Sequence, residues 1–380
     1  MIKILEKTKC CGCQACEQRC PKHCISMEQD AEGFFYPVVN VDLCVNCGIC
    51  EKVCPIQRPY DEKSPIKSIV AINRDLPTRK KSSSGGIFSA IAAQVLKRDG
   101  VVFGTCYDEN WQAQIGFIES QKDLYLLQGS KYIQSRTGNS YTKCEKFLKE
   151  GRVVLFSGTP CQIAGLKHYL RIDYETLLTC DVVCHGCPSP GVWAAYLKEE
   201  VGNLADLKNI SFRNKQNGWK RFNFAMSYKE KASIVEYHRD NVYMRAFLSN
   251  LILRPSCYHC RAKEGRSHSD FTLADYWNVS QFHPEMDDDI GTSLVLINTA
   301  KGLDIFKSMD IEYKDTILEN AALFNAGLKP NAFCHPDREK FFRKFENGES
   351  VKNSIERCLK RSLLHRLKKK VLSKIMNWKK

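Results

Sequence analysis

Residues 10–21 read CCGCQACEQRCP and residues 44–55 read CVNCGICEKVCP, so one cysteine spacing occurs twice. Each stretch follows the pattern C-x2-C-x2-C-x3-C-P, and the second copy begins 34 residues after the first. Three cysteines on one tight loop suit three corners of an iron–sulfur cube, and the fourth cysteine of each run ligates the other cluster in proteins with two such runs. The spacing therefore predicts one [4Fe–4S] site from Cys10, Cys13, Cys16 and Cys54, and a second from Cys44, Cys47, Cys50 and Cys20.

Two other uses of cysteine fit this spacing less well. Zinc ribbons use two separate CxxC pairs rather than triplets followed by Cys-Pro, and disulfides need an oxidising compartment. Cys11 and Cys24 lie outside the repeated pattern, and Cys11 is predicted to be an unused thiol. Between the runs, residues 25–39 predict a short hairpin with its turn near residues 30–33. The first 58 residues resemble a bacterial-type ferredoxin domain with two clusters.

The composition is that of a globular protein with two or three domains. The chain has 380 residues, of which 43% are hydrophobic and 26% are charged. The N-terminus lacks the apolar run of a signal peptide, and no run of eighteen apolar residues predicts a membrane span. Twenty cysteines without a secretion signal favour metal sites in a reducing cytosol over disulfides. We therefore expect a cytoplasmic protein, and no nucleic-acid partner.

The positive charge is concentrated in the C-terminal tail. Residues 357–380 hold ten Lys and Arg and no Asp or Glu, so removing them from the net charge of +14 leaves only +4. Apolar residues recur there every four positions, at Leu359, Leu363, Leu367, Val371 and Ile375. A basic amphipathic helix of this kind suits peripheral contact with the inner face of a membrane. The alternatives are packing on the protein's own body or docking an acidic partner.

Strand and helix patterns alternate after a polar linker. Apolar runs predict strands at residues 68–73, 101–106, 114–118, 153–156, 177–183, 271–277 and 293–298. Helical periodicity is found at residues 87–96, 141–149, 162–170, 191–201 and 245–253. The alternation predicts an α/β body with a mixed or largely parallel sheet, following an α+β ferredoxin domain. We predict a ferredoxin domain at 1–58, a linker at 59–66, the two parts of the body at 67–150 and 151–320, and a helical, basic tail at 321–380.

Two predicted helix starts carry residues suited to ligands. Ser83, Ser84, Gly85 and Gly86 precede a helix, where free N–H groups face an anion; plain helix capping, by Ser84 or a neighbour, explains them equally well. Residues 157–161 read SGTPC between a strand and a helix, where α/β sheets bind ligands at the carboxyl ends of strands. A cysteine at a helix N-terminus has a lowered pKa and suits metal ligation or thiolate chemistry.

A third group of cysteines is spread along the body. Cys257 and Cys260 form a CxxC pair, while Cys161 and Cys184 follow strands in turns where distant segments can converge. These four suit a third [4Fe–4S] cluster or a zinc ion, with Cys187 as the substitute for Cys184. The alternative is a set of inert buried cysteines.

These segments together resemble the family of coenzyme F-420 hydrogenase/dehydrogenase beta subunits, in the form fused to an N-terminal ferredoxin domain. The resemblance covers roughly residues 1–320 and rests on SSGGIFS at 83–89, GSKYIQS at 129–135, LFSGTPCQIAGL at 155–166, CHG at 184–186 and the CxxC pair. It implies an FAD-containing module with its own [4Fe–4S] cluster, ligated by Cys161, Cys184, Cys257 and Cys260. It also implies that Ser84, Gly85, Gly86, Ser130 and Lys131 face FAD. The sequence departs from the family at Ala274 and Asn278, where the family pattern Gly-Asp-Phe-Trp-Gly has glycines.

The cysteine spacing and this resemblance together imply an iron–sulfur flavoprotein oxidoreductase. It would pass electrons between a hydride-carrying small molecule or a redox partner protein and the clusters, because a flavin accepts two electrons and releases them singly. No catalytic residue is predicted, and His185 beside Cys184 is more simply a structural histidine. The alternatives are a non-catalytic ferredoxin-type electron carrier or docking adaptor, and a zinc-containing regulatory module.

Overall fold

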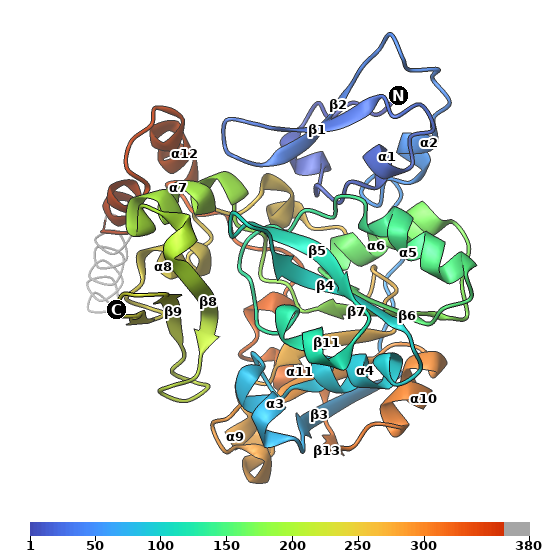
Figure 1. Ribbon diagram of the computed structural model, residues 1–380, viewed down its shortest axis with the longest axis vertical. Coiled ribbons are helices and arrows are strands. Elements are labelled where there is room, and N and C mark those ends of the chain that lie inside the picture. The colour runs from blue at the N-terminus through green and yellow to red at the C-terminus, as the bar shows by residue number, and fades with distance from the viewer. Residues whose placement is uncertain (361–380) are drawn as a thin grey trace, which may run out of the picture.

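The N-terminal lobe is built around the two cysteine runs. The computed structural model describes residues 1–360, and Figure 1 shows this lobe above the rest of the molecule. Its elements are the antiparallel strands β1 (Ile25–Gln29) and β2 (Phe35–Val39) and the short helices α1 (Ala15–Gln18) and α2 (Ile49–Lys52). The predicted hairpin is thus confirmed. At its tip, Gly33 has a φ of 80°, and a Cβ there would lie 2.6 Å from the Cα of Gly191, so the tip packs directly on the body.

A mixed sheet forms the centre of the body, as the sequence predicts. In spatial order, its strands are β13 (Ile311–Asp315), β3 (Lys67–Asn73), β12 (Ser293–Ile297), β11 (Phe271–Asp275), β7 (Leu177–Val182), β6 (Val154–Gly158), β4 (Val101–Tyr107) and β5 (Ala113–Ile118). The four strands from β11 to β4 are parallel, and the pairings outside them are antiparallel. The carboxyl ends of the parallel strands therefore meet at one edge of the sheet.

Helices cover the parallel strands on both faces. Val102, Leu155 and Leu178 are register partners on β4, β6 and β7, and they share one core with α4 (Ile87–Leu96). The neighbouring Phe103 and Phe156 point to the opposite face. There they share a core with residues of α5 and α6 and with the N-terminal lobe. The other helices flanking this sheet are α3 (Leu76–Lys81), α5 (Ser140–Lys149), α6 (Pro160–Leu170), α9 (Val279–Phe282), α10 (Ala300–Lys307) and α11 (Leu318–Ala322).

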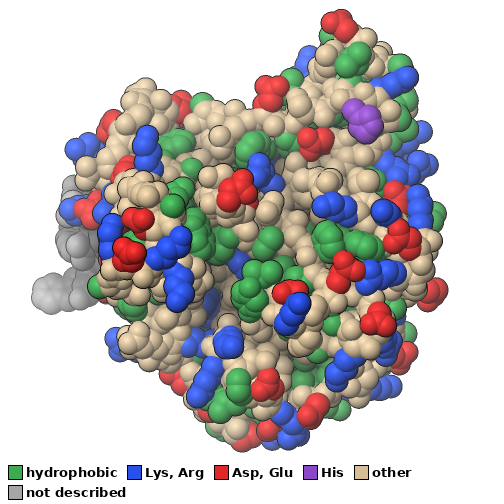
Figure 2. Space-filling model, in the orientation of Figure 1, with side chains coloured by type: hydrophobic (Ala, Val, Ile, Leu, Met, Phe, Trp, Pro, Cys, Tyr) green, Lys and Arg blue, Asp and Glu red, His purple; other side chains and the backbone are tan. Residues whose placement is uncertain are grey.

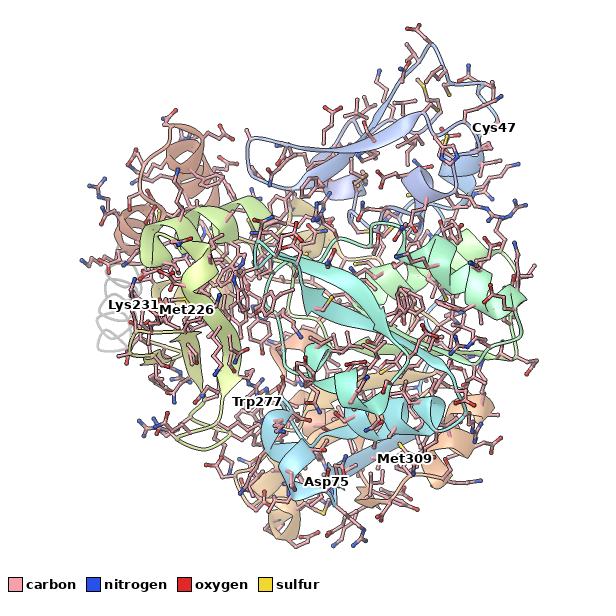
Figure 3. The ribbon with its side chains drawn as sticks, in the orientation of Figure 1. Cys47, Asp75, Met226, Lys231, Trp277 and Met309 are labelled. Atoms are coloured by element: carbon pink, nitrogen blue, oxygen red, sulfur yellow. The ribbon has the colours of Figure 1, made fainter. Side chains whose placement is uncertain are left out.

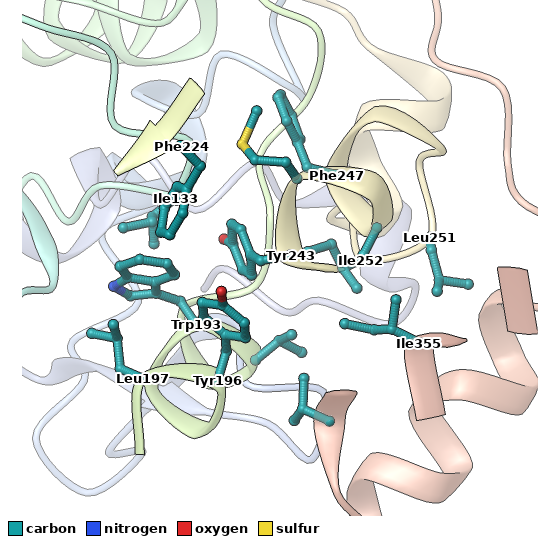
Figure 4. Close-up of a cluster of buried hydrophobic side chains, with 14 of the residues drawn as sticks. Ile133, Trp193, Tyr196, Leu197, Phe224, Tyr243, Phe247, Leu251, Ile252 and Ile355 are labelled. Carbon is teal, nitrogen blue, oxygen red and sulfur yellow. The ribbon is translucent and has the colours of Figure 1, made fainter. Parts of the chain in front are cut away.

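A smaller antiparallel sheet lies beside the main one. It consists of β8 (Leu207–Asn214), β9 (Asn223–Tyr228) and β10 (Ile234–Tyr237), and it packs with α7 (Pro190–Val201), α8 (Val242–Leu248) and α12 (Arg338–Glu346). Trp193, Phe212, Phe224 and Tyr243 are fully buried where these elements meet, and Figure 4 shows part of this aromatic core. Their large apolar surfaces hold the small sheet to the helices.

The predicted helix at 245–253 is misplaced. Helix α8 begins after Asn241, whose side-chain oxygen accepts a hydrogen bond from the Met244 N–H at 3.0 Å. The helix ends at Leu248, because Asn250 adopts a left-handed conformation with φ of 65°. Leu251 to Leu253 remain fully buried outside the helix, so their apolar character reflects burial rather than helical periodicity.

The described part of the C-terminal tail packs on the protein itself. Residues 351–360 are helical, and Val351, Ile355 and Leu359 are buried in the same core as Trp193. The next positions of the predicted stripe, Leu363, Leu367, Val371 and Ile375, lie outside the described residues. Within residues 1–360, no helix is both long and apolar enough to cross a bilayer.

Candidate iron–sulfur sites and cofactor cavity

The first cysteine run surrounds a small cavity lined by residues of the lobe. The cavity is lined by Cys10, Cys13, Cys16 and Cys54, together with Cys11. Gly12 and Gln14 adopt left-handed conformations, with φ of 72° and 62°, which turn the loop tightly around the cavity. Burial raises the pKa of Cys16, so its thiol stays neutral unless a cation stabilises the thiolate. We call this cavity the inner site.

The second run surrounds a matching cavity at the far end of the lobe, which we call the outer site. It is lined by Cys20, Cys44, Cys47 and Cys50, together with Cys24. The structure thus brings together the two predicted sets of four cysteines, each with the last cysteine of the other run. Cys24 lies outside the repeated spacing, and its Sγ atom is 3.4 Å from Sγ of Cys20. Cys47 is exposed to solvent, and Figure 3 labels it at the outer end of the lobe.

Hydrogen bonds from the body hold the loop of the inner site. Gln134 Nε2 donates to the Cys11 carbonyl at 2.9 Å, and Thr137 Oγ1 donates to the Cys13 carbonyl at 2.9 Å. The Thr137 N–H also donates to the Gln14 side chain at 2.6 Å. Helix α6 approaches closely here because Gly165 has no side chain; a Cβ would lie 3.0 Å from both Cβ and Sγ of Cys13.

The cysteines of the body converge beside the inner site. Cys161 lies in the first turn of α6, after a capping box between Thr159 and Gln162. Cys184 and Cys187 follow β7, and Cys257 and Cys260 lie on the 3₁₀ turn η4 (Pro255–His259) and directly after it. The Cys187 N–H donates to Cys257 Sγ at 3.3 Å. This third site therefore contains the four predicted cysteines and also Cys187, the predicted substitute.

The thiols of this third site influence one another. Hydrogen bonding with Cys187 lowers the pKa of Cys257 to about 7 and also lowers the pKa of Cys184. A hydrogen bond with Cys11, followed by burial, raises the pKa of Cys161, so the lowered pKa expected for a cysteine at this helix start is wrong. Cys11 is therefore not an isolated thiol, because it lies between the inner site and Cys161. Its place directly beside Cys10 was the only sequence signal of this role.

The donor chemistry of the three sites fits iron–sulfur clusters. Every candidate ligand is a cysteine, which is the ligand that [4Fe–4S] clusters use. Among residues 1–360, no three His, Cys, Asp or Glu side chains are arranged around a single metal-ion position. A cubane has a different requirement, because each of its four thiolates binds a different iron.

A large cavity of about 1410 Å³ lies at the carboxyl ends of the parallel strands, beside the third site. Sites for small molecules typically measure about 300–1,000 Å³, so this one has room for a dinucleotide and a second molecule. Cys184 and Cys187 contribute to its wall, which makes it adjacent to the third site. Four of the five residues expected to face FAD line it: Ser84, Gly86, Ser130 and Lys131.

The start of α4 forms one wall of the cavity. Gly86 precedes the helix with φ of 83°, and no side chain of the described residues caps the first turn. Ser84, a predicted cap, instead donates through Oγ to the Thr292 carbonyl at 2.9 Å. Gly85 lies behind the wall, where a Cβ would be 2.6 Å from the Ala71 carbonyl oxygen. Gly85 thus serves packing between β3 and β12, while uncapped N–H groups at the helix start suit an anion.

Lys131 lies in the loop opposite that helix. The residue is half-buried, and its Nζ donates to the carbonyls of Leu126, Gln128 and Gly129 at 3.2, 2.8 and 3.3 Å. Burial lowers the pKa of Lys131 to about 8. Its ammonium therefore already binds its own loop.

The opposite wall carries aromatic and cationic groups. Arg213 pairs with Asp275 at 2.8 Å and lies over the rings of Phe222 and Trp277, with centroid distances of 4.2 and 4.9 Å. Among residues 1–360, the charged residues lining the cavity are Lys131, Arg213, Lys220, Arg239, Arg245 and a single carboxylate, Asp275. This excess of cations favours an anionic ligand.

Two residues singled out in the sequence have structural partners. His185 Nε2 lies 2.6 Å from Asn250 Oδ1, and its ring packs edge-on against Phe247. Asn278 stands where the family has a glycine, yet its φ is −102°, which other residues adopt freely. Its amide donates to the Asn320 carbonyl at 2.6 Å, so this substitution adds a hydrogen bond without backbone strain.

Comparison with protein families covers most of the chain. Two family models describe the N-terminal and C-terminal parts of the coenzyme F420 hydrogenase/dehydrogenase beta subunit, and they match residues 69–140 and 151–319, respectively. Residues 9–57 match the "4Fe-4S dicluster domain".

Individual relatives are distant or short. The F subunit of the F(420)H(2) dehydrogenase of Methanosarcina mazei is 22% identical over 186 residues, covering 47% of this chain and 52% of that protein. The PorD subunit of the pyruvate synthase of Thermotoga maritima is 40% identical over 57 residues, covering 15% of this chain and 54% of that protein. The chain thus spans about half the length of these curated relatives. A chain of the F420-reducing [NiFe] hydrogenase complex from Methanosarcina barkeri is 17% identical with a TM-score of 0.46, covering 79% of this chain and 92% of that chain.

Proposed function

Because the chain belongs to the family of coenzyme F420 hydrogenase/dehydrogenase beta subunits, with an N-terminal domain of the 4Fe-4S dicluster type, we propose that it is an FAD-dependent iron–sulfur oxidoreductase. It passes electrons between a two-electron carrier in the large cavity and a protein partner at the outer site. Iron–sulfur electron transfer of the kind typical of these beta subunits follows from the family itself.

The order of the sites along the molecule is the observation that supports this proposal. The outer site reaches solvent at Cys47, the inner site shares its lobe, and the third site begins at Cys161. Cys161 and Gly165 are one turn apart on α6, roughly 6 Å along the helix axis, and Gly165 packs against Cys13 of the inner site. Cys184 and Cys187 then form part of the cavity wall. Three candidate clusters thus lead from the surface to the cavity.

A flavin bound in the cavity would exchange two electrons with an organic molecule and single electrons with the clusters. The chain offers the uncapped first turn of α4 to its diphosphate, at Gly86 and Ile87. Lys220, Arg239 and Arg245 attract further anionic groups from the opposite wall, which suits a negatively charged electron carrier. Arg213 is held by Asp275 and presents the aromatic wall formed by Phe222 and Trp277.

The protein partner is proposed to dock around the outer site. Val41, Leu43 and Val45 lie on the loop that leads into the second cysteine run, and 62%, 55% and 58% of their surfaces are exposed. In the space-filling view, the lobe that carries this loop projects from the body at upper right (Figure 2). Exposed apolar residues next to a redox site suit transient association with another electron-transfer protein.

Cofactor analysis of anaerobically purified full-length protein tests the proposal. We expect about twelve irons per chain, four for each of three cubanes, together with FAD released on denaturation. The Cys161→Ser variant should lose about four irons and keep the others. Clusters without flavin would support a carrier or docking adaptor instead, and zinc in place of iron would contradict the proposal.

A further inference from the structure

Arg254 is a buried arginine at the junction of the inner site and the third site. Only 1% of its surface is exposed. Its Nε donates to the Cys10 carbonyl at 2.8 Å, and its Nη2 lies 3.5 Å from Cys10 Sγ and donates to the Phe35 carbonyl at 2.9 Å. Its Nη1 donates to the Gln134 side-chain oxygen at 3.0 Å. The guanidinium thus reaches the first cysteine of the inner site.

The backbone of the same residue belongs to the third site. The Arg254 N–H donates to the Cys187 carbonyl at 2.9 Å, and the Arg254 carbonyl accepts from the Cys257 N–H at 2.9 Å. Arg254 is therefore anchored between two candidate ligand loops of the body while its side chain extends into the lobe. Its position is fixed by both sites.

No carboxylate compensates this charge among the described residues. The other buried arginines in the described part of the chain have such partners: Arg79 pairs with Asp288, Arg213 with Asp275 and Arg338 with Glu32. Arg254 forms no ion pair with Asp or Glu within residues 1–360 and lies instead over the ring of Tyr36, 4.2 Å from its centroid. Burying an uncompensated charge is strongly unfavourable, so this arginine needs a negative group close to it.

We propose that Arg254 sets the reduction potential of the inner cluster, taking the place of the water that burial removes. This inference rests on the proposed function, since it requires a cluster on Cys10, Cys13, Cys16 and Cys54. One-electron reduction adds one negative charge to such a cluster and forms or breaks no bond. Solvent stabilises that charge at the outer site, whereas Arg254 stabilises it at the inner site through its charge and its hydrogen bond to Cys10 Sγ.

Arg254 is thus a positioning and tuning residue, not a catalytic one. Without it, the inner cluster would be harder to reduce. Electron transfer between the outer site and the cavity would then be hindered at the inner site. The exposed cations at the outer site, Lys22 and the Met1 ammonium that pairs with Glu51, are screened by solvent and have no comparable effect.

The test is a redox titration of the full-length, cluster-loaded protein, followed by electron paramagnetic resonance. In Arg254→Gln we expect one cluster signal to need a lower potential, with at least a tenfold lower ratio of reduced to oxidised cluster at a fixed potential. For a one-electron couple this corresponds to about 59 mV. Arg254→Lys keeps the charge and should recover most of the shift.

A matched control separates tuning from docking of the lobe. Arg338 is buried at the same interface and donates to Glu32 at 2.9 and 2.6 Å and to the Leu253 carbonyl at 3.1 Å, while within residues 1–360 it forms no hydrogen bond to a candidate ligand cysteine. Arg338→Gln should loosen the interface without moving the potential of either ferredoxin cluster. An equal shift in this control would overturn the proposal, because the effect would then be structural.

A second variant covers the case in which Arg254→Gln fails to retain its iron. Gln134→Glu keeps the size of the side chain and gives Arg254 a carboxylate partner, so the same signal should again shift to lower potential. Unchanged potentials in Gln134→Glu and in an iron-loaded Arg254→Gln would overturn the role of Arg254. Absence of cluster signals from the unaltered protein would instead overturn the proposed function.

Discussion

The inner and outer sites have the same cysteine spacing but opposite surroundings. The loop of the inner site is bound by Gln134, Thr137 and Arg254 of the body. The loop of the outer site carries exposed residues, including Val45 and Cys47. The repeated spacing specifies which cysteines converge, while the surroundings specify what each site can contact. In the proposed function, the outer site therefore exchanges electrons with the protein partner, and the inner site transfers them within the chain.

Replacing one cysteine in each run should give the largest difference between the two sites. Cys13→Ser and Cys47→Ser should each lose about four irons, because each removes one ligand. Cys13→Ser should also lower the unfolding temperature further, since the loop that carries Cys13 is hydrogen-bonded to the body and metal binding contributes folding free energy. Iron analysis and thermal unfolding of both variants provide the measurement. Equal losses of thermal stability would contradict the difference between the sites.

The close approach of α6 gives the next test. Valine at position 165 would crowd Cys13 and Tyr141, because Cys13 Sγ and Tyr141 Oη each lie 3.0 Å from the place where its Cβ would be. Overpacking typically costs about 1–3 kcal/mol, so Gly165→Val should unfold earlier and perturb the inner cluster signal while sparing the outer one.

Ala194→Val is the matched control for this substitution. Ala194 is exposed on α7, so the change there costs only the lower helix propensity of valine, less than about 0.7 kcal/mol. Perturbation of the outer cluster signal by Gly165→Val, or an equal loss of stability in the control, would show that close contact with Cys13 is not the cause.

Removing a hydrogen bond should lower the free energy of unfolding more at the inner loop than at the outer loop. Thr137 is almost fully buried and binds both the Cys13 carbonyl and Gln14, so Thr137→Val should cost about 1–3 kcal/mol by leaving these groups unsatisfied. Asn40, near the outer loop, is exposed and accepts from the Asp42 N–H. Asn40→Ala should therefore change the free energy of unfolding by less than about 0.5 kcal/mol. Urea unfolding of both variants measures the difference, and a costlier Asn40→Ala would reverse the comparison.

The sequence predicted local features better than long-range ones. The strands at 68–73, 101–106 and 153–156 lie close to the observed β3, β4 and β6, because each is a short apolar run bounded by polar residues or glycine. Both sets of cluster cysteines converge as expected, since their spacing is a local property of two loops. The prediction of a helix at 245–253 was wrong, because buried apolar residues outside a helix have no distinguishing periodicity.

The surroundings of the sites could not be predicted, because they depend on which distant segments meet. The spacing left Cys11 without a role, whereas α6 places Cys161 beside it. Gly85 was expected to face a cofactor but lies against the Ala71 carbonyl, and the Lys131 ammonium binds three carbonyls of its own loop. Nothing in the local sequence of Arg254 indicates that it reaches Cys10.

The smallest expected effect concerns an ion pair that ties the first cysteine run to the body. Arg19 Nη1 lies 3.2 Å from Glu145 Oε2 on α5, and both side chains are partly exposed. Burial tends to raise the pKa of Glu145, but the hydrogen bond from Lys149 and the charge of Arg19 outweigh it and hold that pKa below its usual value. The ion pair therefore stabilises the fold above the unfolded pKa of Glu145, and the contribution is lost only as the pH falls through the lowered folded pKa.

A double-mutant cycle with Arg19→Met and Glu145→Gln should give a coupling of about 1 kcal/mol or less, because solvent screens exposed pairs. Thermal unfolding at pH 6 and pH 8 should return the same coupling, since Glu145 stays ionised at both. A coupling that vanishes at pH 6 would show that the pKa of Glu145 is raised, and that the lobe is held to the body at this point by packing alone.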